Sequence, residues 1–328
     1  MSAWINNRTD SAPTAVLLLP ASSLAGERGS AHRRWLSRGS VTRREPPFEA
    51  LDLVLEALGI DAPAAGRAAL RRCGHGDVAA GRWYAAADPV HLETRLSHLA
   101  LRALLPNELD GDDLRDVFGA LQATLGEDGE FSFDAHDGLG YVSGGDGFAT
   151  AAHSPAALDG LNPERHTPQG SAAAGLHRML GEIQLVLHAH ASNIRRESRG
   201  LRAVNSLCLG GGGALPDLPR QPLPALHGDE PLLRGFWACT GGRHQAGCAG
   251  ILHCLETSPE GFVADMSTID GEQFGAELEV LKHRLRKGAL GRVTILTTDG
   301  VRATLERRDL IRFWRVTSPV FSRGEADA

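Results

Sequence analysis

Apolar residues recur along the chain with two different spacings, and each spacing predicts a type of element. Thr14–Leu19 (TAVLLL) is a nearly continuous apolar run, which is typical of a strand covered on both faces. Phe48–Leu58 places large apolar residues on one helical face, and Gly59 is suited to end that helix. The same reasoning predicts strands at Gly250–Glu256, Phe262–Met266 and Arg292–Thr298, a helix at Glu272–Lys287, and an edge strand or helical turn at Ile311–Val316.

The middle of the chain has a different pattern. Asp110 or Asn107 can cap a helix that buries apolar residues at helical spacing and ends at Gly126. Two short strands, Phe131–Phe133 and Gly140–Gly144, are predicted to join through Asp137-Gly138. A long helix is predicted from Ser171 to Arg199, with Gly200 as its stop. Two segments are predicted to lack regular structure, namely a polar surface loop at Gly26–Pro47 and a proline-rich linker at Leu215–Pro231.

Strands alternate with helices at both ends of the chain, which favours an α/β sheet. The middle block would then be an α+β domain within that sheet domain. The predicted boundaries are residues 1–86 for the first part of the α/β core, 87–214 for the insert, 215–231 for the linker and 232–328 for the second part of the core.

Composition excludes some classes of function. The chain has 328 residues with a formal net charge of -6, so bulk charge gives no support for a nucleic-acid partner. Apolar runs stay well short of the roughly 20 residues that a membrane helix needs. Ala15–Leu19 lacks a basic leader, and the five cysteines are irregularly spaced, which favours reduced thiols. We therefore expect a cytoplasmic protein without a membrane span.

The most specific motif is HAHASNIRRESRGLRAVNSLCLGGGG, His188–Gly213. It resembles a segment of the archaeal-type cofactor-independent phosphoglycerate mutases, with matches at His190, Asn193, Arg196, Gly200, Asn205 and Gly210–Gly213. The resemblance implies a degenerate core like that of the alkaline phosphatase superfamily, with an inserted domain. Together with ADPVHL (Ala87–Leu92), the motif looks even more like the bacterial RpfE-type regulatory proteins.

This motif yields the candidate ligand-binding residues. Arg196 could offer a bidentate guanidinium to an anion, and the two asparagines could offer amide hydrogen bonds; alternatively, they fix a turn at the end of a helix. The backbone N–H groups of the glycine run could hold a phosphate, although a flexible turn is the alternative. The candidate residues are His190, Asn193, Arg196, Asn205, Gly211 and Gly212.

The metal ligands that the resemblance implies are largely missing. The first strand ends Leu19-Pro20-Ala21 without a carboxylate, and Thr298-Asp299-Gly300 keeps an aspartate without the family's histidine. Met266–Phe274 holds Asp270 and also lacks a histidine. Two metals that stabilise a transferring phosphoryl group need several converging ligands, so Asp270 and Asp299 are weak metal candidates and no catalytic residue is predicted. A separate group of cysteines and histidines could suggest zinc, but it contains no Cys-x-x-Cys pair: Cys239, His244, Cys248, His253 and Cys254.

The sequence therefore predicts a non-catalytic phosphoglycerate mutase-like protein, regulatory or anion-binding, with no cofactor. Its partner would be a small phosphorylated metabolite or another protein. One alternative is an active phosphoryl-transfer enzyme with rearranged ligands and a divalent metal, Mn²⁺ or Zn²⁺. The other alternative is a protein-interaction scaffold. Phe313 and Trp314 could pack into the core or form a contact surface, and periodicity does not decide between the two.

Overall fold

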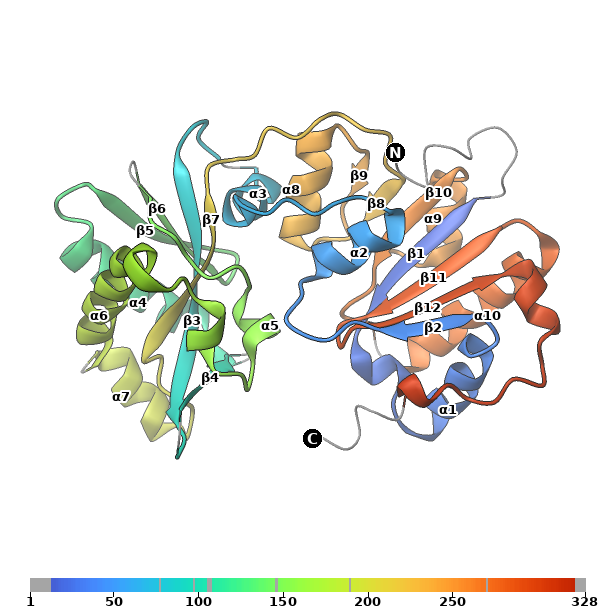
Figure 1. Cartoon of the computed structure of the whole chain (residues 1–328), viewed down its shortest axis with the longest axis horizontal. Coiled ribbons are helices and arrows are strands. Elements are labelled where there is room, and N and C mark those ends of the chain that lie inside the picture. The colour runs from blue at the N-terminus through green and yellow to red at the C-terminus, as the bar shows by residue number, and fades with distance from the viewer. Residues whose placement is uncertain are drawn as a thin grey trace. The chain divides into compact units, whose positions relative to one another are not determined.

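The computed structural model describes residues 13–76, 78–96, 98–104, 108–144, 147–188, 190–269 and 271–321, with the backbone alone at 26–29 and 271. These residues form two compact units (Figure 1). Unit 1 comprises the described parts of Met1–Ala62 and Leu218–Ala328, and unit 2 comprises those of Pro63–Asp217. Both units mix helices with a β-sheet.

Unit 1 contains a seven-stranded sheet in the order β2-β12-β11-β1-β10-β8-β9. Five strands run parallel, and β12 and β2 join antiparallel at one edge. The strands are β1 (Thr14–Leu19), β2 (Ser40–Arg43), β8 (Ala225–His227), β9 (His244–Gln245), β10 (Gly261–Asp265), β11 (Arg292–Thr297) and β12 (Val301–Glu306). The predicted strands at the start of the chain and at 262–266 and 292–298 are thus confirmed, apart from their last residues at Met266 and Thr298.

Both faces of this sheet are covered. Ala15, Leu17 and Leu19 lie in one core with apolar residues of α1, α9 and α10, whereas Val16 and Leu18 are buried on the opposite face. There α2 packs on β1 and β11. The helices of unit 1 are α1 (Gly26–Leu36), α2 (Ala50–Leu58), α8 (Pro231–Thr240), α9 (Ile251–Thr257) and α10 (Gly271–Lys287), with 3-10 turns η2 (Ala21–Leu24), η6 (Arg307–Ile311) and η7 (Pro319–Phe321).

Several predictions for unit 1 are wrong. The supposed loop Gly26–Pro47 contains α1 and β2, because Trp35 and Leu36 of an otherwise polar helix are buried. The supposed strand Gly250–Glu256 is helix α9, in which Ile251 and Cys254, three residues apart, face the core. The proline-rich segment includes strand β8. At Ile311–Val316 the predicted edge strand is absent, while the alternative of a helical turn is met at Ile311, the last residue of η6.

Unit 2 is built on an antiparallel sheet in which the long strand β3 is central. β3 (Trp83–Thr94) pairs with β4 (Leu99–Ala103), β6 (Leu139–Gly144) and β7 (Ser206–Gly213), and β6 pairs with β5 (Phe131–His136). The predicted hairpin through Asp137-Gly138 is confirmed. Both turn residues have positive φ angles, 48° for Asp137 and 81° for Gly138, which suits an Asp-Gly turn.

The helices of unit 2 pack on this sheet. They are α3 (Arg67–Gly74), α4 (Gly111–Leu125), α5 (Pro155–Leu158), α6 (Ala174–His188) and α7 (Ala191–Ser198), with 3-10 turns η4 (Pro163–His166) and η5 (Gly170–Ala173). Asp110 caps α4 as predicted, while Asn107 lies outside the described residues. The predicted long helix is wrong in one respect: it is two helices, because extended backbone at His190 starts α7 afresh.

The boundaries of the units differ from those predicted. The first lies at residue 63 instead of 87, because α3 packs against β3 and β7 and so belongs to unit 2. The second lies after Asp217, so most of the supposed linker belongs to unit 1. Within the described part of the chain, every helix is too short or too polar to cross a bilayer.

Candidate functional site

The predicted ligand-binding motif begins where α7 starts. His190 is the N-cap residue of α7, and its Nδ1 lies 2.7 Å from the hydroxyl of Ser192. Asn193 is buried one turn later, and its amide Nδ2 donates to the carbonyls of Leu187 and Val204, each at 2.9 Å. Its Oδ1 accepts the Val204 N–H at 2.8 Å. The Asn193 side chain thus ties together the end of α6, α7 and the start of β7.

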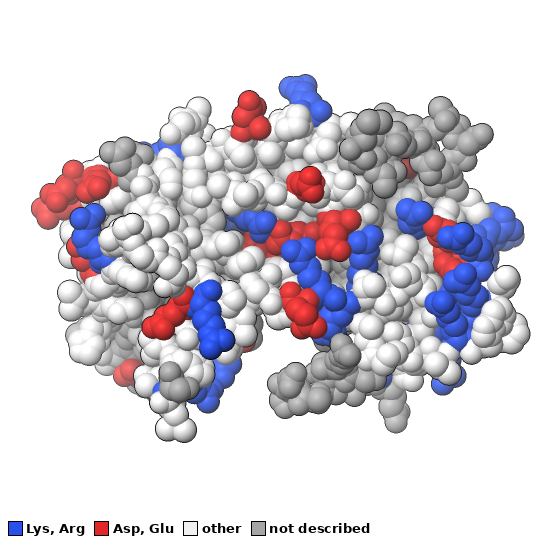
Figure 2. Space-filling view, viewed as in Figure 1, with Lys and Arg blue, Asp and Glu red and all other residues white. Residues whose placement is uncertain are grey.

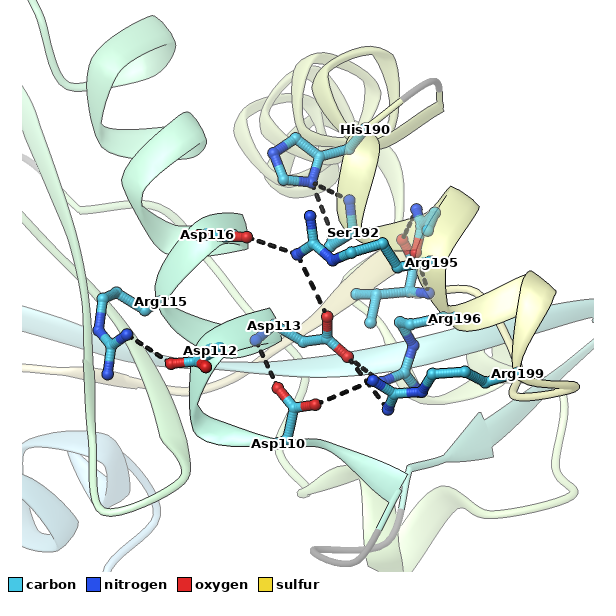
Figure 3. Close-up of polar contacts among 12 residues, drawn as sticks. Asp110, Asp112, Asp113, Arg115, Asp116, His190, Ser192, Arg195, Arg196 and Arg199 are labelled. Atoms are coloured by element: carbon cyan, nitrogen blue, oxygen red, sulfur yellow. Dashed lines mark hydrogen bonds and ion pairs between the residues drawn. The ribbon is translucent and has the colours of Figure 1, made fainter.

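Arg196 lies at the centre of a network of charged residues between α7 and α4 (Figure 3). Its side chain is fully buried, and it donates to the carbonyls of Arg202 at 2.8 Å and Glu108 at 2.6 Å. It also pairs at 3.1 Å with Asp113, whose side chain is 2% exposed. Asp113 lies outside the sequence motif, so the motif did not predict it as a partner of Arg196. Its one recognisable feature in the sequence is its position three residues after Asp110, the residue that caps α4.

The surrounding arginines are paired in the same way. Arg195 bonds to Asp116 at 2.5 Å, Arg199 pairs with Asp110 at 3.2 Å, and Arg115 pairs with Asp112 at 2.6 Å. The N–H of Asp113, followed by the Arg199 guanidinium, lowers the pKa of Asp110. The network drawn in Figure 3 therefore sets four arginines against four aspartates, and its positive charge is balanced within the fold.

The other predicted ligand residues are not beside Arg196. Asn205 makes two hydrogen bonds to the backbone of Leu92: its Oδ1 accepts the N–H at 2.7 Å, and its Nδ2 donates to the carbonyl at 3.0 Å. Gly211 and Gly212 lie six and seven residues further along strand β7, which is roughly 20 Å away at about 3.3 Å per residue. Their N–H groups donate to the carbonyl of Ala151 and the hydroxyl of Thr150, both at 2.8 Å. One small anion cannot contact all six residues.

The carboxyl end of the parallel strands in unit 1 is where the resemblance places metal ligands. Asp265 is the last residue of β10, and its two oxygens accept the N–H groups of Ser267 at 3.1 Å and Glu230 at 3.2 Å. Asp299 follows β11, and its carboxylate pairs with Arg43 at 2.9 Å. Asp270 lies outside the described residues. Both described carboxylates thus serve contacts inside the unit.

The cysteine and histidine residues of unit 1 are also engaged with the protein. Cys248 and Cys254 lie with their sulfur atoms 3.8 Å apart, and the hydrogen bond between them lowers the pKa of Cys248 and raises that of Cys254. His244 contacts the carbonyl of Gly228 at 2.9 Å, and His253 contacts the side chain of Gln245 at 2.8 Å. Among the described residues, the one group of three side chains with metal-ligand spacing is elsewhere, in unit 2.

Comparisons with known proteins give matches in structure alone. No protein-family model matches the chain. No curated protein matches it either. The chain is similar to a cofactor-independent phosphoglycerate mutase from Thermoplasma acidophilum, at 16% identity and a TM-score of 0.43, over 95% of this chain and 98% of the other. It is also similar to the PH0037 protein from Pyrococcus horikoshii, at 13% identity and a TM-score of 0.49, over the same shares. At these identities and TM-scores neither structure bears on what this chain does.

Proposed function

We propose that this chain is a non-catalytic, phosphoglycerate mutase-like regulatory protein of the RpfE type, which acts by binding a protein partner. In this proposal unit 1 is a degenerate phosphatase-superfamily core and unit 2 is its insert. The observation that carries the proposal is the use of Asp265 and Asp299 inside unit 1. Asp265 accepts a backbone N–H at each of its two oxygens, and Asp299 is paired with Arg43, whose positive charge opposes the binding of a cation there.

The phosphoglycerate mutase reaction would need more than a free carboxylate. Two metals that bridge a transferring phosphoryl group require several anionic and imidazole ligands within a few ångströms of one another. His227 ends the neighbouring strand β8, but it is buried and its Nε2 lies 3.0 Å from the Ser258 hydroxyl. Arg43 also brings a positive charge to Asp299. These contacts support a unit that has kept its sheet without the family's chemistry.

An exposed aromatic segment supports a protein partner over a metabolite. Phe313 and Trp314 follow η6 and are 75% and 65% exposed, and their rings contact each other at a centroid distance of 5.3 Å. Ile311 and Val316 are exposed beside them in the sequence. Exposed aromatic residues are enriched where proteins bind one another. In contrast, the side chains predicted to hold a phosphorylated metabolite are bound to protein groups.

Charge suggests the kind of partner. Figure 2 shows arginine and lysine side chains gathered at the end of unit 1 that Figure 1 draws in orange and red. Arg307 and Arg308, which lie just before the aromatic segment, are both exposed. A partner that offers an apolar groove rimmed by acidic residues would complement this surface.

A coupled assay of the interconversion of 2- and 3-phosphoglycerate tests the non-catalytic part of the proposal. Purified full chain is incubated with Mn²⁺, Co²⁺ or Zn²⁺, and an active cofactor-independent mutase serves as the positive control. We expect no turnover above the background without protein. Turnover at an enzyme-like rate that disappears in Asp299→Ala would contradict the proposal and favour the enzyme with rearranged ligands.

The binding part is tested by affinity capture followed by reconstitution. Wild type is compared with Phe313→Ser/Trp314→Ser and with the matched control Leu185→Ser, which changes an exposed apolar residue of unit 2. A captured protein is then purified and titrated calorimetrically against all three. We expect the double variant to weaken binding at least about tenfold while the control leaves it unchanged. Equal affinity for all three would remove the aromatic segment from the proposal.

A further inference from the structure

Two histidines and an aspartate of unit 2 meet where helix α3 faces the β5–β6 hairpin. His75 is the C-cap residue of α3, His136 is the last residue of β5, and Asp137 is the first residue of the turn. We call these three residues the hairpin cluster. Each offers one potential ligand atom, and the three atoms lie within 4.8 Å of one another. No sequence pattern joins His75 to the turn, because 61 positions separate it from His136.

The distances in the hairpin cluster suit a tetrahedral metal ion. Asp137 Oδ2 lies 3.5 Å from His75 Nδ1 and 3.5 Å from His136 Nε2. Zinc binds imidazole nitrogen and carboxylate oxygen at about 2.0–2.2 Å, so tetrahedral geometry places two ligand atoms roughly 3.3–3.5 Å apart. Both separations are long for a hydrogen bond between these atoms. His136 is 39% exposed and can rotate to bring its nitrogen nearer to that of His75.

The burial of His75 is a second, independent observation. Its side chain is only 2% exposed, and its Nε2 has no hydrogen-bond partner among the described residues. Its other nitrogen faces Asp137 at 3.5 Å. A buried polar side chain without hydrogen bonds is costly, and natural proteins rarely keep one without a reason. Coordination through Nδ1, the nitrogen that faces Asp137, would give this buried ring one strong bond, although it would not give Nε2 a partner.

The charges around the hairpin cluster leave room for a cation. Arg71 and Arg72 lie on the same helix as His75, and both guanidinium groups lie over the ring of Tyr141. Arg71 is paired through two nitrogens with Asp88, at 2.7 and 3.0 Å. Arg72 is paired with Asp134 at 2.9 Å. Each arginine is therefore paired with a carboxylate other than Asp137, although both still disfavour positive charge at His75.

We propose that the hairpin cluster binds one divalent transition-metal ion, zinc by preference, through His75, His136 and Asp137, with water at a fourth position. Zinc binds imidazole nitrogen as well as carboxylate oxygen, whereas Mg²⁺ and Ca²⁺ favour sites with oxygen ligands alone. A set of two imidazoles and one carboxylate therefore favours zinc over those two ions. The ion joins the end of α3 to the β5–β6 turn. This site is independent of the proposed function and lies in a different unit from Asp265 and Asp299.

Calorimetric titration of the metal-free full chain with Zn²⁺ tests the site, and Co²⁺ provides a spectroscopic readout. His136→Ala and Asp137→Asn remove ligands near the surface, and asparagine tolerates the positive φ of the turn. The matched control His177→Ala removes an exposed histidine from α6. Cys248→Ser tests the competing cysteine and histidine residues of unit 1. Thermal unfolding without metal checks that each variant folds like the wild type.

We expect one ion per chain in the wild type, His177→Ala and Cys248→Ser, and affinity weakened at least about tenfold in His136→Ala and Asp137→Asn. Bound Co²⁺ should give tetrahedral ligand-field bands without a thiolate charge-transfer band, because the three ligands are nitrogen and oxygen. Unchanged affinity in both ligand variants would overturn the proposal. So would absence of binding in the wild type, or a thiolate band that disappears in Cys248→Ser.

Discussion

Arg196–Asp113 in unit 2 and Arg43–Asp299 in unit 1 are both arginine–aspartate pairs with nitrogen–oxygen distances near 3 Å, but water reaches them to very different degrees. The side chains of the first pair are 0% and 2% exposed, and those of the second are 17% and 37% exposed. The first pair lies in the segment predicted to bind a ligand, and the second lies at the edge predicted to bind metal. In both regions, residue types suited to function hold the fold together.

The difference in exposure decides what each pair contributes to stability. Removing one partner of a buried pair leaves an uncompensated charge in the interior, which costs about 3–5 kcal/mol, whereas exposed pairs contribute about 0–1 kcal/mol. The two regions should therefore respond very differently to the same kind of substitution. Four substitutions, taken in decreasing order of their predicted cost in stability, test this difference.

Arg196→Met should have the largest effect. The substitution removes the one fully buried guanidinium from Asp113, which keeps only the longer contacts with the half-exposed Arg195 (3.4 Å) and Arg199 (3.9 Å). It also removes the donors to the carbonyls of Arg202 and Glu108. We expect the free energy of unfolding to fall by about 3–5 kcal/mol, measured by urea denaturation. Arg115→Ala, which breaks an exposed pair on α4, is the matched control and should change stability little.

A double variant shows whether the buried charge is the cause. Arg196→Met/Asp113→Leu removes both charges, so it should recover part of the stability lost in Arg196→Met. If the single variant is as stable as Arg115→Ala, the network of Figure 3 is not structural. Arg196 would then be available to a ligand, as the sequence motif first suggested.

Asn193→Ala should have the second largest effect. The buried amide makes three hydrogen bonds to backbone groups of Leu187 and Val204, and alanine leaves those groups without partners. We expect a loss of about 2–3 kcal/mol in the free energy of unfolding. Asn205→Ala is the comparison, since Asn205 makes two bonds to Leu92 from a less buried position and should cost less. Similar losses of stability in Asn193→Ala and Asn205→Ala would show that the difference in burial between the two asparagines does not decide how much each contributes.

Periodicity predicted the elements whose buried residues follow one spacing. Strand β1 and helices α2, α4 and α10 were found because their apolar residues form a continuous run or a helical stripe. The same method missed α1, a mostly polar helix in which Trp35 and Leu36 are the buried residues within 30–36, the part whose side chains the structure describes. It assigned α9 as a strand because its seven residues are too short a run to distinguish the two periods.

The candidate sites were predicted less well, because partners distant in sequence decide whether a polar residue is free. Arg196 was identified as an anion ligand, but Asp113 lies 83 positions away and neutralises it. Asp137 was predicted to lie in the turn, yet only the fold brings His75 to it and to the neighbouring His136. A single sequence gives no signal for such pairings.

Glu230→Gln should have a smaller effect that depends on pH. Burial raises the pKa of Glu230 to about 7, and the nearby Asp265 carboxylate adds to the shift. Because the folded-state pKa lies above the unfolded value of about 4.5, the folded chain holds this proton more tightly. The stabilisation that this tighter proton binding gives to the folded state is complete below pH 4.5, and it is lost as the pH rises through 7.

Glutamine stays neutral at every pH and keeps an oxygen that can accept the Leu233 N–H. Between pH 4.5 and 8 the wild type should lose on the order of 1 kcal/mol relative to Glu230→Gln, a modest figure because Glu230 as a whole residue is only partly buried. Unfolding by urea at several pH values measures the difference between the two proteins. Parallel stability curves would show that Glu230 titrates as it does in the unfolded chain.

Asp299→Ala should have the smallest effect on stability and is the most informative about function. The substitution removes the pair with Arg43 and the acceptor for the Thr297 hydroxyl at a site that water reaches. We expect the free energy of unfolding to fall by no more than about 1 kcal/mol, measured by the same urea titration. Arg43→Met, which breaks the pair from the other side, should give a similar loss. If Asp299 instead served a metal centre, Arg43→Met would free its carboxylate and strengthen the binding of Mn²⁺, while Asp299→Ala would abolish it. If Arg43→Met and Asp299→Ala respond to Mn²⁺ in the same way, the result supports a structural pair that holds β2 against the turn between β11 and β12. If they respond in opposite ways, the result supports Asp299 as a metal ligand.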